Sequence, residues 1–338
     1  MKAVYLEGPQ NVYIKDIEKP EWKEGYALVK IVTMGICGSD VGAYRGVNKI
    51  VQYPVILGHE LAGIVEEISP DNKSGVKVGD RVVLDPFIWC GECTACKKGR
   101  PNACEHLKTL GVMTDGGMRD YILHPDHLLV KIPDEVPWDL APLSEPLAIA
   151  LHGYHRAKVQ AGEYYAINGA GAIGLLGAMI ANAYGAHPIL IDPIQARLDF
   201  AKNVCGIELT TTPDKAHDFI YEVTDGRGAD AVYEASGASP AIAACIDYAS
   251  YAGRIVYTGW PKGLTEMNTN DITKKELDIY GGRNNKGEFP ECLELIRRGK
   301  VDVRNIITKT IGIEEAPQAL KDLSEHPADY LKIVIING

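Results

Sequence analysis

Four cysteines fall within one short segment of the chain, CGECTACKKGRPNAC. They are Cys90, Cys93, Cys96 and Cys104. Four thiolates this close in sequence can surround one metal ion tetrahedrally, and a four-sulfur zinc site leaves no position open for water or substrate. The spacing therefore predicts a structural zinc that holds a lobe spanning about residues 88–106. An iron–sulfur cluster takes the same ligands and is the main alternative, while buried or disulfide-bonded cysteines are the other.

Other side chains that can bind zinc occur in three separate motifs. Cys37 lies in GICGSD, His59 and Glu60 lie in GHE, and Glu145 lies in LSEPL. One thiolate, one imidazole and one or two carboxylates would form a zinc site with room for water or an alcohol. Leucine, alanine and glycine follow the GHE motif, so the HExxH pattern of metalloproteases is absent from it and that class is disfavoured.

A glycine-rich turn, GAGAIG, follows a predicted strand at 164–167 and opens a predicted helix at 173–184. Its candidate pyrophosphate contacts are Gly169, Gly171, Ala172, Ile173 and Gly174. Glycines permit a tight turn and close approach of a pyrophosphate, which the helix N-terminus favours; a turn without a ligand is the alternative. The second strand, 188–191, ends at Asp192, whose carboxylate can bond an adenosine ribose and repel a 2′-phosphate. These features predict NAD rather than NADP.

Three more residues are candidate ligand contacts near the predicted sheet. Arg197, one turn after Asp192, could stack on adenine or be a solvated helix residue. Thr258 ends a later predicted strand, and Arg283 follows the last one in the segment GGRNN. Arg283 and its neighbour Asn284 could also contact the substrate, because an arginine can grip a carboxylate or hydroxyls with two donors. A surface arginine at a domain junction is the alternative.

The composition limits the class of protein. With 338 residues, 46% of them hydrophobic, the chain is long enough for about two domains. Its net charge of -10 argues against nonspecific binding to nucleic acid or an anionic membrane. The first ten residues lack the apolar run of a signal peptide, and the apolar stretch at 172–183 is too short to span a bilayer. We expect a cytoplasmic protein with a small-molecule substrate.

The elements that must position these motifs change in character along the chain. Short β-branched runs separated by turn residues predict a sheet-rich first domain, residues 1–150. Strands then alternate with helices, which is typical of a parallel α/β sheet, over residues 151–284. The remaining segment, 285–338, carries two amphipathic helices and a closing strand at 330–336, and we expect it to return to the first domain.

The ordered set of CGSD, GHE, the four-cysteine lobe, SEPL, GxGxxG and Asp192 resembles the zinc-dependent medium-chain alcohol dehydrogenases over essentially the whole chain. The resemblance implies an α/β protein with a GroES-like β-rich catalytic domain, a Rossmann domain with a doubly wound parallel sheet, and an active cleft where the two meet. It implies two zinc ions per chain, NAD, and a homodimer or homotetramer. The catalytic zinc would be held by Cys37 and His59, with Glu60 and Glu145 completing the site or exchanging at it.

Two glutamates at one zinc pose a charge problem. The Cys37 thiolate and one glutamate already neutralise Zn²⁺, and a second would weaken the Lewis acidity that ionises an alcohol. We therefore expect that Glu60 and Glu145 do not both bind tightly during turnover. Ser39, two residues after the thiolate, is the candidate for substrate contact and proton relay because a hydroxyl both accepts and donates. Beyond it the relay could continue through water, Glu145 or Tyr44.

The acidic zinc ligands resemble those of polyol and threonine dehydrogenases more than those of ethanol-type enzymes. Together with the 37–46 stretch and the GRN segment, they resemble the sorbitol and sugar-acid 5-dehydrogenase branch. This resemblance implies hydride transfer between NAD(H) and a secondary alcohol or ketone of a polyol or a sugar acid, an aldonate such as L-gulonate or L-galactonate. The alternatives are an L-threonine 3-dehydrogenase and a non-catalytic binding or regulatory protein on the same fold.

Overall fold

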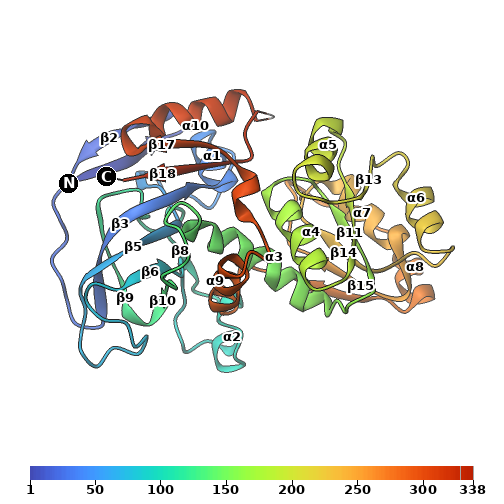
Figure 1. Ribbon diagram of the computed structural model, residues 1–338, viewed down its shortest axis with the longest axis horizontal. Coiled ribbons are helices and arrows are strands. Elements are labelled where there is room, and N and C mark those ends of the chain that lie inside the picture. Colours follow the sequence, from blue (N-terminus) through green and yellow to red (C-terminus); the bar gives the residue numbers. More distant parts are fainter. Residues whose placement is uncertain (328, 338) are drawn as a thin grey trace. The chain divides into compact units, whose positions relative to one another are not determined.

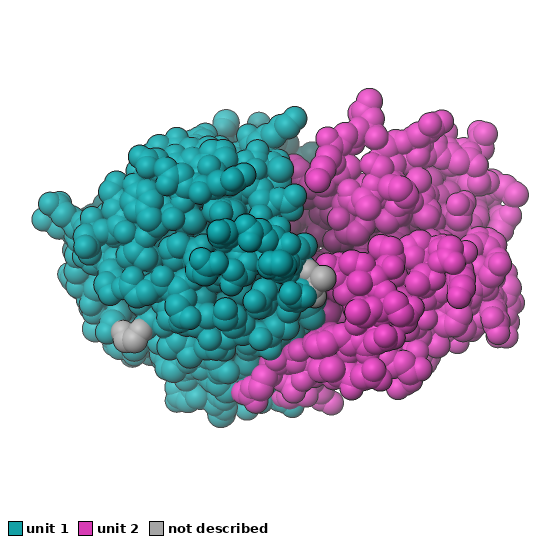
Figure 2. All heavy atoms as spheres, turned by 90° about the horizontal axis from the view of Figure 1, so that it is seen from above, with its two compact units in different colours: residues 1–145, 289–298, 306–338 teal, residues 146–288, 299–305 magenta. Residues whose placement is uncertain are grey.

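The computed structural model describes residues 1–327 and 329–337. The chain forms two compact units, coloured teal and magenta in Figure 2. Unit 1 comprises Met1–Glu145, Phe289–Arg298 and Ile306–Gly338, and unit 2 comprises Pro146–Glu288 and Gly299–Asn305. The boundaries therefore differ from those predicted at 150 and 285.

Two contacts within unit 2 explain this difference. Glu288 is held by a side chain of unit 2, His152, at 2.8 Å, so residues 285–288 stay with that unit. The side-chain amide of Asn305 donates to the carbonyl of Val204 at 3.3 Å, which keeps residues 299–305 there as well. The predicted C-terminal return to the first domain is thus interrupted by a short excursion into unit 2.

Unit 1 is built around a seven-stranded sheet (Figure 1). Its strands are β3 (Tyr26–Ile36), β5 (Glu60–Glu67), β6 (Arg81–Leu84), β9 (Tyr121–Pro125), β10 (Leu129–Lys131), β17 (Ile307–Gly312) and β18 (Lys332–Ile336). The order is β10-β6-β5-β3-β18-β17, and β9 also pairs with β3. The central strand β3 is largely buried because apolar side chains occupy most of its positions. Its antiparallel partner β18 brings the far end of the sequence beside the first domain.

Smaller elements complete unit 1. The strands are β1 (Lys2–Gly8), β2 (Asn11–Asp16), β4 (Val55–Ile56), β7 (Phe87–Ile88) and β8 (Lys108–Thr109), and the helices are α1 (Gly38–Tyr44), α2 (Thr94–Lys97), α9 (Phe289–Arg297) and α10 (Ala316–Glu325). The sheet order β2-β1-β4 forms a second, three-stranded sheet, and the β7-β8 pair flanks the cysteine lobe. One apolar cluster, which includes Leu57, Leu61 and Met118, contains buried residues of both sheets.

Unit 2 contains a six-stranded parallel sheet (Figure 1). Its strands are β11 (Tyr164–Asn168), β12 (His187–Ile191), β13 (Leu209–Thr211), β14 (Ala229–Glu234), β15 (Ala249–Tyr257) and β16 (Asp278–Gly281). The connecting helices are α3 (Ser144–Ala157), which begins in unit 1, α4 (Ala172–Ala183), α5 (Gln195–Asn203), α6 (Ala216–Val223), α7 (Ser239–Tyr248) and α8 (Thr269–Lys275). The strand order β13-β12-β11-β14-β15-β16 is that of a Rossmann sheet, so the predicted fold class is confirmed.

Helix α4 illustrates how the sequence fits this sheet. Its residues, AIGLLGAMIANA, include no charged side chain, and most of them are buried. A helix that is apolar on all sides is stable only inside a protein. At its length it is a core helix, and no helix in the described part of the chain has the length and apolar character needed to cross a membrane.

A buried hydrogen bond joins the two ends of the long segment of unit 2, Pro146–Glu288. His152 Nδ1 in α3 lies 2.8 Å from Oε1 of Glu288, and the side chains are only 5% and 8% exposed. The backbone amide of Lys286 donates to the other oxygen of Glu288. Burial opposes ionisation of this carboxyl, but hydrogen bonds from His152, His155 and Lys286 outweigh it and lower the pKa of Glu288 to about 2.

We predict that Glu288→Gln destabilises the protein by about 1–2 kcal/mol at pH 7, because a buried charge-assisted hydrogen bond is lost. The folded-state pKa lies below the ordinary value, so ionised Glu288 stabilises the fold above about pH 4.5 and loses this effect as the pH falls toward 2. Urea unfolding followed by circular dichroism should show the two proteins converging at low pH. The exposed Glu266→Gln is the control; an equal loss in both variants would contradict the prediction.

Candidate zinc and cofactor sites

The four cysteines of the lobe converge as the spacing predicts. Sγ of Cys93 lies 3.5 Å from that of Cys96 and 3.8 Å from that of Cys104, and Cys104 lies 3.5 Å from Cys90. Four sulfurs at 2.3 Å from a tetrahedral zinc would be about 3.8 Å apart, whereas a disulfide would need about 2.05 Å. The arrangement therefore fits a closed zinc site.

Backbone amides around the lobe favour thiolates. The amides of Glu92 and Cys93 point at the sulfur of Cys90, and that of His106 points at Cys104. The backbone amides of Cys96 and Glu105 lower the pKa of Cys93 to about 6. Burial and the neighbouring sulfurs raise the pKa of Cys96 instead, as expected when several sulfurs share one space without a cation. Thiolates are the zinc-binding form of cysteine.

A second cluster forms where β3 and β5 lie side by side. Cys37 follows β3 and is the N-cap of α1, while His59 and Glu60 stand at the start of β5. The register pairs Gly35 with Glu60, which brings the two motifs to the same end of the sheet. One ligand atom each from Cys37, His59 and Glu60 lies within 4.8 Å of the others. The structure thus joins three of the four predicted catalytic zinc ligands.

Ser39 and Asp40 surround the imidazole of this cluster. Ser39 Oγ lies 3.3 Å from Nε2 of His59. Asp40 Oδ2 accepts a hydrogen bond from the Cys37 amide at 2.9 Å, and its Oδ1 lies 3.6 Å from Nδ1 of His59. Asp40 therefore fixes the turn that carries the thiolate and faces the imidazole nitrogen turned away from Ser39.

Glu145 lies outside the set of three convergent ligand atoms. It stands in the first turn of α3, is 1% exposed, and both of its carboxylate oxygens lack a hydrogen-bond partner. Burial, with the nearby Glu60 adding to it, raises the pKa of Glu145 to about 8. Glu145 is thus a buried acid beside the cluster and not one of its convergent ligands.

The buried polar atoms of the cluster indicate a cation. His59 Nδ1, Glu60 Oε2 and Asp40 Oδ1 are enclosed without a hydrogen-bond partner, a state that costs free energy unless something satisfies them. Burial lowers the pKa of His59, but Asp40 and Cys37 raise it more strongly, and the net pKa lies well above its ordinary value. The acidic neighbours of this imidazole therefore favour a cation at this place. The sulfur, nitrogen and oxygen donors fit zinc with an open position.

Lys332, at the start of β18, is a member of this cluster that the sequence analysis missed. Its ammonium lies 2.5 Å from Oε1 of Glu60 and 3.2 Å from the carbonyl of Ile36, and its side chain is 3% exposed. Burial lowers the pKa of Lys332, but Glu60 and Cys37 raise it more, so the net pKa is raised. A lysine within the apolar run of the predicted strand 330–336 was the available signal.

The glycine-rich turn in unit 2 has the form expected of a pyrophosphate-binding loop. Gly169 has φ +102°, and Gly171 is the N-cap of α4, whose first turn contains Ala172 and Ile173. A Cβ on Gly174 would lie 1.7 Å from the carbonyl oxygen of Gly169, so a side chain cannot fit there. The helix N-terminus is therefore packed closely against the turn, with amides available to an anion.

Asp192 lies directly after β12 and is 3% exposed. Its Oδ2 accepts from the amide of Ala170 in the glycine-rich turn at 2.8 Å, and its Oδ1 accepts from the amide of Ile194 at 2.9 Å. Arg197 Nη1 lies 3.6 Å from Oδ2. Asp192 thus ties the turn to the second strand, with Arg197 beside it.

The remaining predicted contacts are distributed around unit 2 and the core of unit 1. Thr258 follows β15 and donates its amide to the carbonyl of Glu234, while Arg283 and Asn284, both partly buried, follow β16. Tyr44 is 9% exposed and packs in the apolar core of unit 1.

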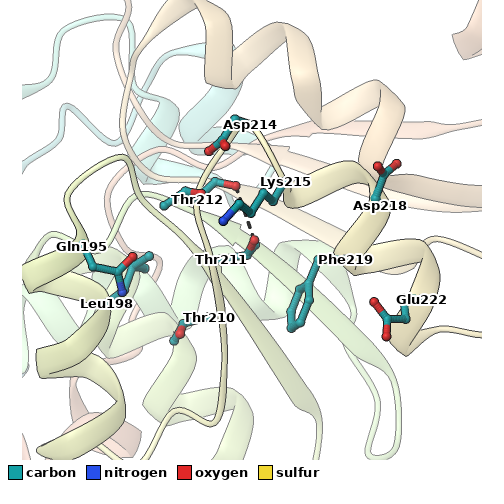
Figure 3. A pocket seen from close by; sticks show the side chains of 10 residues that line it. All are labelled: Gln195, Leu198, Thr210, Thr211, Thr212, Asp214, Lys215, Asp218, Phe219 and Glu222. Atoms are coloured by element: carbon teal, nitrogen blue, oxygen red, sulfur yellow. Dashed lines mark hydrogen bonds between the residues drawn. The ribbon is translucent and has the colours of Figure 1, made fainter.

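A pocket of about 420 Å³ opens between α5, β13 and α6 (Figure 3). It is lined by Gln195, Leu198, Thr210, Thr211, Thr212, Asp214, Lys215, Asp218, Phe219 and Glu222. Gln195 stands three residues after Asp192, yet none of the predicted cofactor residues lines the pocket. Its acidic rim also makes it a poor place for a phosphate group.

Comparison with known proteins agrees with this arrangement. Residues 23–134 match the alcohol dehydrogenase GroES-like domain, and residues 172–298 match the zinc-binding dehydrogenase family. An uncharacterized zinc-type alcohol dehydrogenase-like protein of Haemophilus influenzae is 51% identical, over 98% of each chain. Sorbitol dehydrogenase of Bacillus subtilis is 30% identical, over 99% of this chain and 97% of the relative.

Solved structures with the same fold hold both kinds of nicotinamide cofactor. An alcohol dehydrogenase of Escherichia coli CFT073 complexed with NADH is 30% identical, with a TM-score of 0.92 over 99% of both chains. A zinc-binding dehydrogenase of Sinorhizobium meliloti bound to NADP is 31% identical, with a TM-score of 0.89 over 99% of this chain and 98% of that one. With a GroES-like domain, a Rossmann sheet and this extent of identity, the chain belongs to the zinc-binding medium-chain alcohol dehydrogenase family.

Proposed function

We propose that this protein is a zinc-dependent dehydrogenase that transfers hydride between NAD(H) and a secondary alcohol or ketone of a polyol or sugar acid, such as an aldonate. The observation that carries the proposal is the open cluster of Cys37, His59 and Glu60, whose ligand atoms lie within 4.8 Å of one another. The cysteine lobe offers four sulfurs and would be closed to substrate. A chain that needed zinc for stability alone would have no use for the second, three-ligand cluster.

Cys37, His59 and Glu60 would hold the catalytic zinc, and Glu145 would exchange with Glu60. When bound, zinc supplies Lewis acidity to an alcohol oxygen, and the nicotinamide supplies a hydride acceptor. The protein must then hold the alcohol in place and remove its proton. Ser39 is suited to the proton transfer because its hydroxyl stands 3.3 Å from Nε2 of His59 and can both accept and donate.

The choice of NAD is supported by Asp192. Its carboxylate is fixed by two backbone amides, so it cannot easily turn away from a ribose at this corner. A negative charge held in this way would repel a 2′-phosphate. Arg197, at 3.6 Å, is already engaged with this carboxylate and would offset only part of the repulsion. A polyol or sugar acid is supported by Glu60 in the cluster, by the nearby Glu145 and by the 30% identity with sorbitol dehydrogenase.

We predict about two zinc ions per purified chain and a secondary-alcohol substrate. Metal analysis, NADH titration by fluorescence, and a screen of polyols, aldonates and L-threonine with NAD and with NADP would test this. Turnover of a polyol or aldonate with NAD is the expected result. Preference for threonine would favour threonine 3-dehydrogenase instead, and one zinc without NADH binding would favour a non-catalytic protein.

We predict that the two zinc sites can be lost independently. Cys37→Ser should remove one zinc and lower turnover by more than about 100-fold, beyond the usual effect of outer residues around a metal, while leaving the melting temperature nearly unchanged. Cys93→Ser should remove the other zinc and destabilise the lobe. The half-buried Cys205→Ser serves as the control for losing a thiol. Loss of both metals from Cys37→Ser would argue against separate sites.

We predict that Asp192→Asn shifts cofactor preference toward NADP. The asparagine keeps an acceptor for the Ile194 amide but removes the charge, so affinity for NAD should fall about ten-fold, because hydrogen bonds to charged groups contribute roughly 1.5–3 kcal/mol. Affinity for NADP should rise. Dissociation constants for NADH and NADPH, with the exposed Asp199→Asn on α5 as control, measure this. An unchanged ratio of the two affinities would contradict the assignment.

A further inference from the structure

Lys332 occupies an unusual position for a lysine. Strand β18 is otherwise apolar, with the sequence KIVII, and its first residue carries an ammonium group that is 3% exposed. The ammonium contacts Oε1 of Glu60 at 2.5 Å and the carbonyl of Ile36, next to Cys37, at 3.2 Å. Burying a lysine is costly unless a negative charge and hydrogen bonds compensate. The groups that compensate Lys332 belong to the catalytic cluster.

Glu60 is constrained from a second direction by Gly35. A Cβ on Gly35 would lie 1.9 Å from Oε2 of Glu60, so the carboxylate occupies the space above this glycine. Oε1 is engaged by Lys332, whereas Oε2 is buried without a hydrogen-bond partner. The carboxylate thus has one oxygen fixed to a cation of the protein and one oxygen left for a metal.

The ammonium also changes the charge balance of the cluster. Zinc with the Cys37 thiolate and one glutamate is neutral, and a second glutamate would leave an uncompensated negative charge in a buried site. The positive charge of Lys332 offsets that second carboxylate. In the proposed exchange of Glu60 and Glu145, the carboxylate that does not bind zinc then has a cation of the protein nearby.

We propose that Lys332 is a positioning residue of the catalytic zinc site, which holds Oε1 of Glu60 so that only Oε2 can reach the metal and which balances the charge of the second glutamate. The inference rests on the proposed function, since it requires a zinc at Cys37 and His59. The alternative is a purely structural role, in which Lys332 ties β18 to β3 and β5 through the same two contacts.

A double-mutant cycle separates these two roles. The variants are Lys332→Met, Lys332→Arg, Glu60→Gln and the double variant Lys332→Met/Glu60→Gln, with Lys309→Met on the neighbouring strand β17 as the control. Lys309 has a 40% exposed side chain and lies 3.9 Å from Asp322. Each full-length protein is stripped of metal and titrated with Co²⁺, whose absorption spectrum reports the ligand geometry. Cys37→Ser, with cobalt in the lobe alone, supplies the background spectrum.

We predict that Lys332→Met shifts the cobalt spectrum of the catalytic site and weakens its Co²⁺ affinity by about 10- to 100-fold, the usual effect of a lost outer partner of a metal ligand. Lys332→Arg should recover most of the affinity, because it keeps the charge. In the Glu60→Gln background, Lys332→Met should cause no further loss, since Lys332 acts through Glu60. Lys309→Met should match the wild-type protein.

An unchanged cobalt spectrum and affinity in Lys332→Met would overturn the inference. An equal loss of affinity with and without Glu60 would also overturn it, because it would indicate a structural role. Melting temperatures of all variants identify any protein that fails to fold, in which case Lys332→Arg and the double variant still decide the question. If the wild-type protein binds cobalt only in the lobe, the proposed function fails first and the inference falls with it, so the two failures are distinguishable.

Discussion

The organisation of unit 1 depends on how the fold handles buried negative charge. The half-buried Cys37 and the buried carboxyl groups of Asp40, Glu60 and Glu145 bring acidic groups together in the same region. Ionised groups are unstable in such surroundings unless cations or hydrogen bonds balance them. The negative neighbours Asp40 and Cys37 raise the pKa of His59, and burial raises the pKa of Glu145 to about 8, so both side chains hold protons more strongly than usual. Zinc would replace those protons. The buried acidic groups, which are unfavourable in the folded chain, would thus give the site its affinity for a divalent cation.

The strand register places the oppositely charged side chains of Glu60 and Lys332 next to each other. The pairing of Gly35 with Glu60 fixes the carboxylate against β3, and the pairing of Ile36 with Ile333 brings Lys332 alongside it. A single-residue slip in either pair would turn these side chains to the other face of the sheet. In unit 2 a comparable fixation occurs at the corner of the parallel sheet, where Asp192 bonds the glycine-rich turn. At these two places strand pairing and backbone hydrogen bonds fix the candidate functional groups, whereas the ligands of the cysteine lobe come from one loop.

Much of this arrangement could be predicted from local sequence patterns. The C-x2-C-x2-C-x7-C spacing was sufficient for the lobe, since its ligands come from one loop, and GAGAIG with Asp192 was sufficient for the Rossmann turn. Lys332 could not be paired with Glu60 from the sequence, because the partners are 272 residues apart and meet only through the order of strands in the sheet. The unit boundaries differed for a related reason: the short connecting segments that contain Glu288 and Asn305 make tertiary contacts within unit 2 that local sequence patterns do not reveal.

The long chain separation between Lys332 and the motifs it touches has a consequence for how the protein matures. Every residue of unit 2 lies between β3 and β18 along the chain. Lys332 can therefore reach Glu60 only after β18 has paired with β3. Contacts between such remote segments form late because closing a long loop costs entropy before the contact repays it. The cysteine lobe needs only a fifteen-residue stretch and can close early. Stable binding of zinc at Cys37, His59 and Glu60 would then indicate that folding is complete. A partly folded chain could hold zinc in the cysteine lobe but would not retain the second ion.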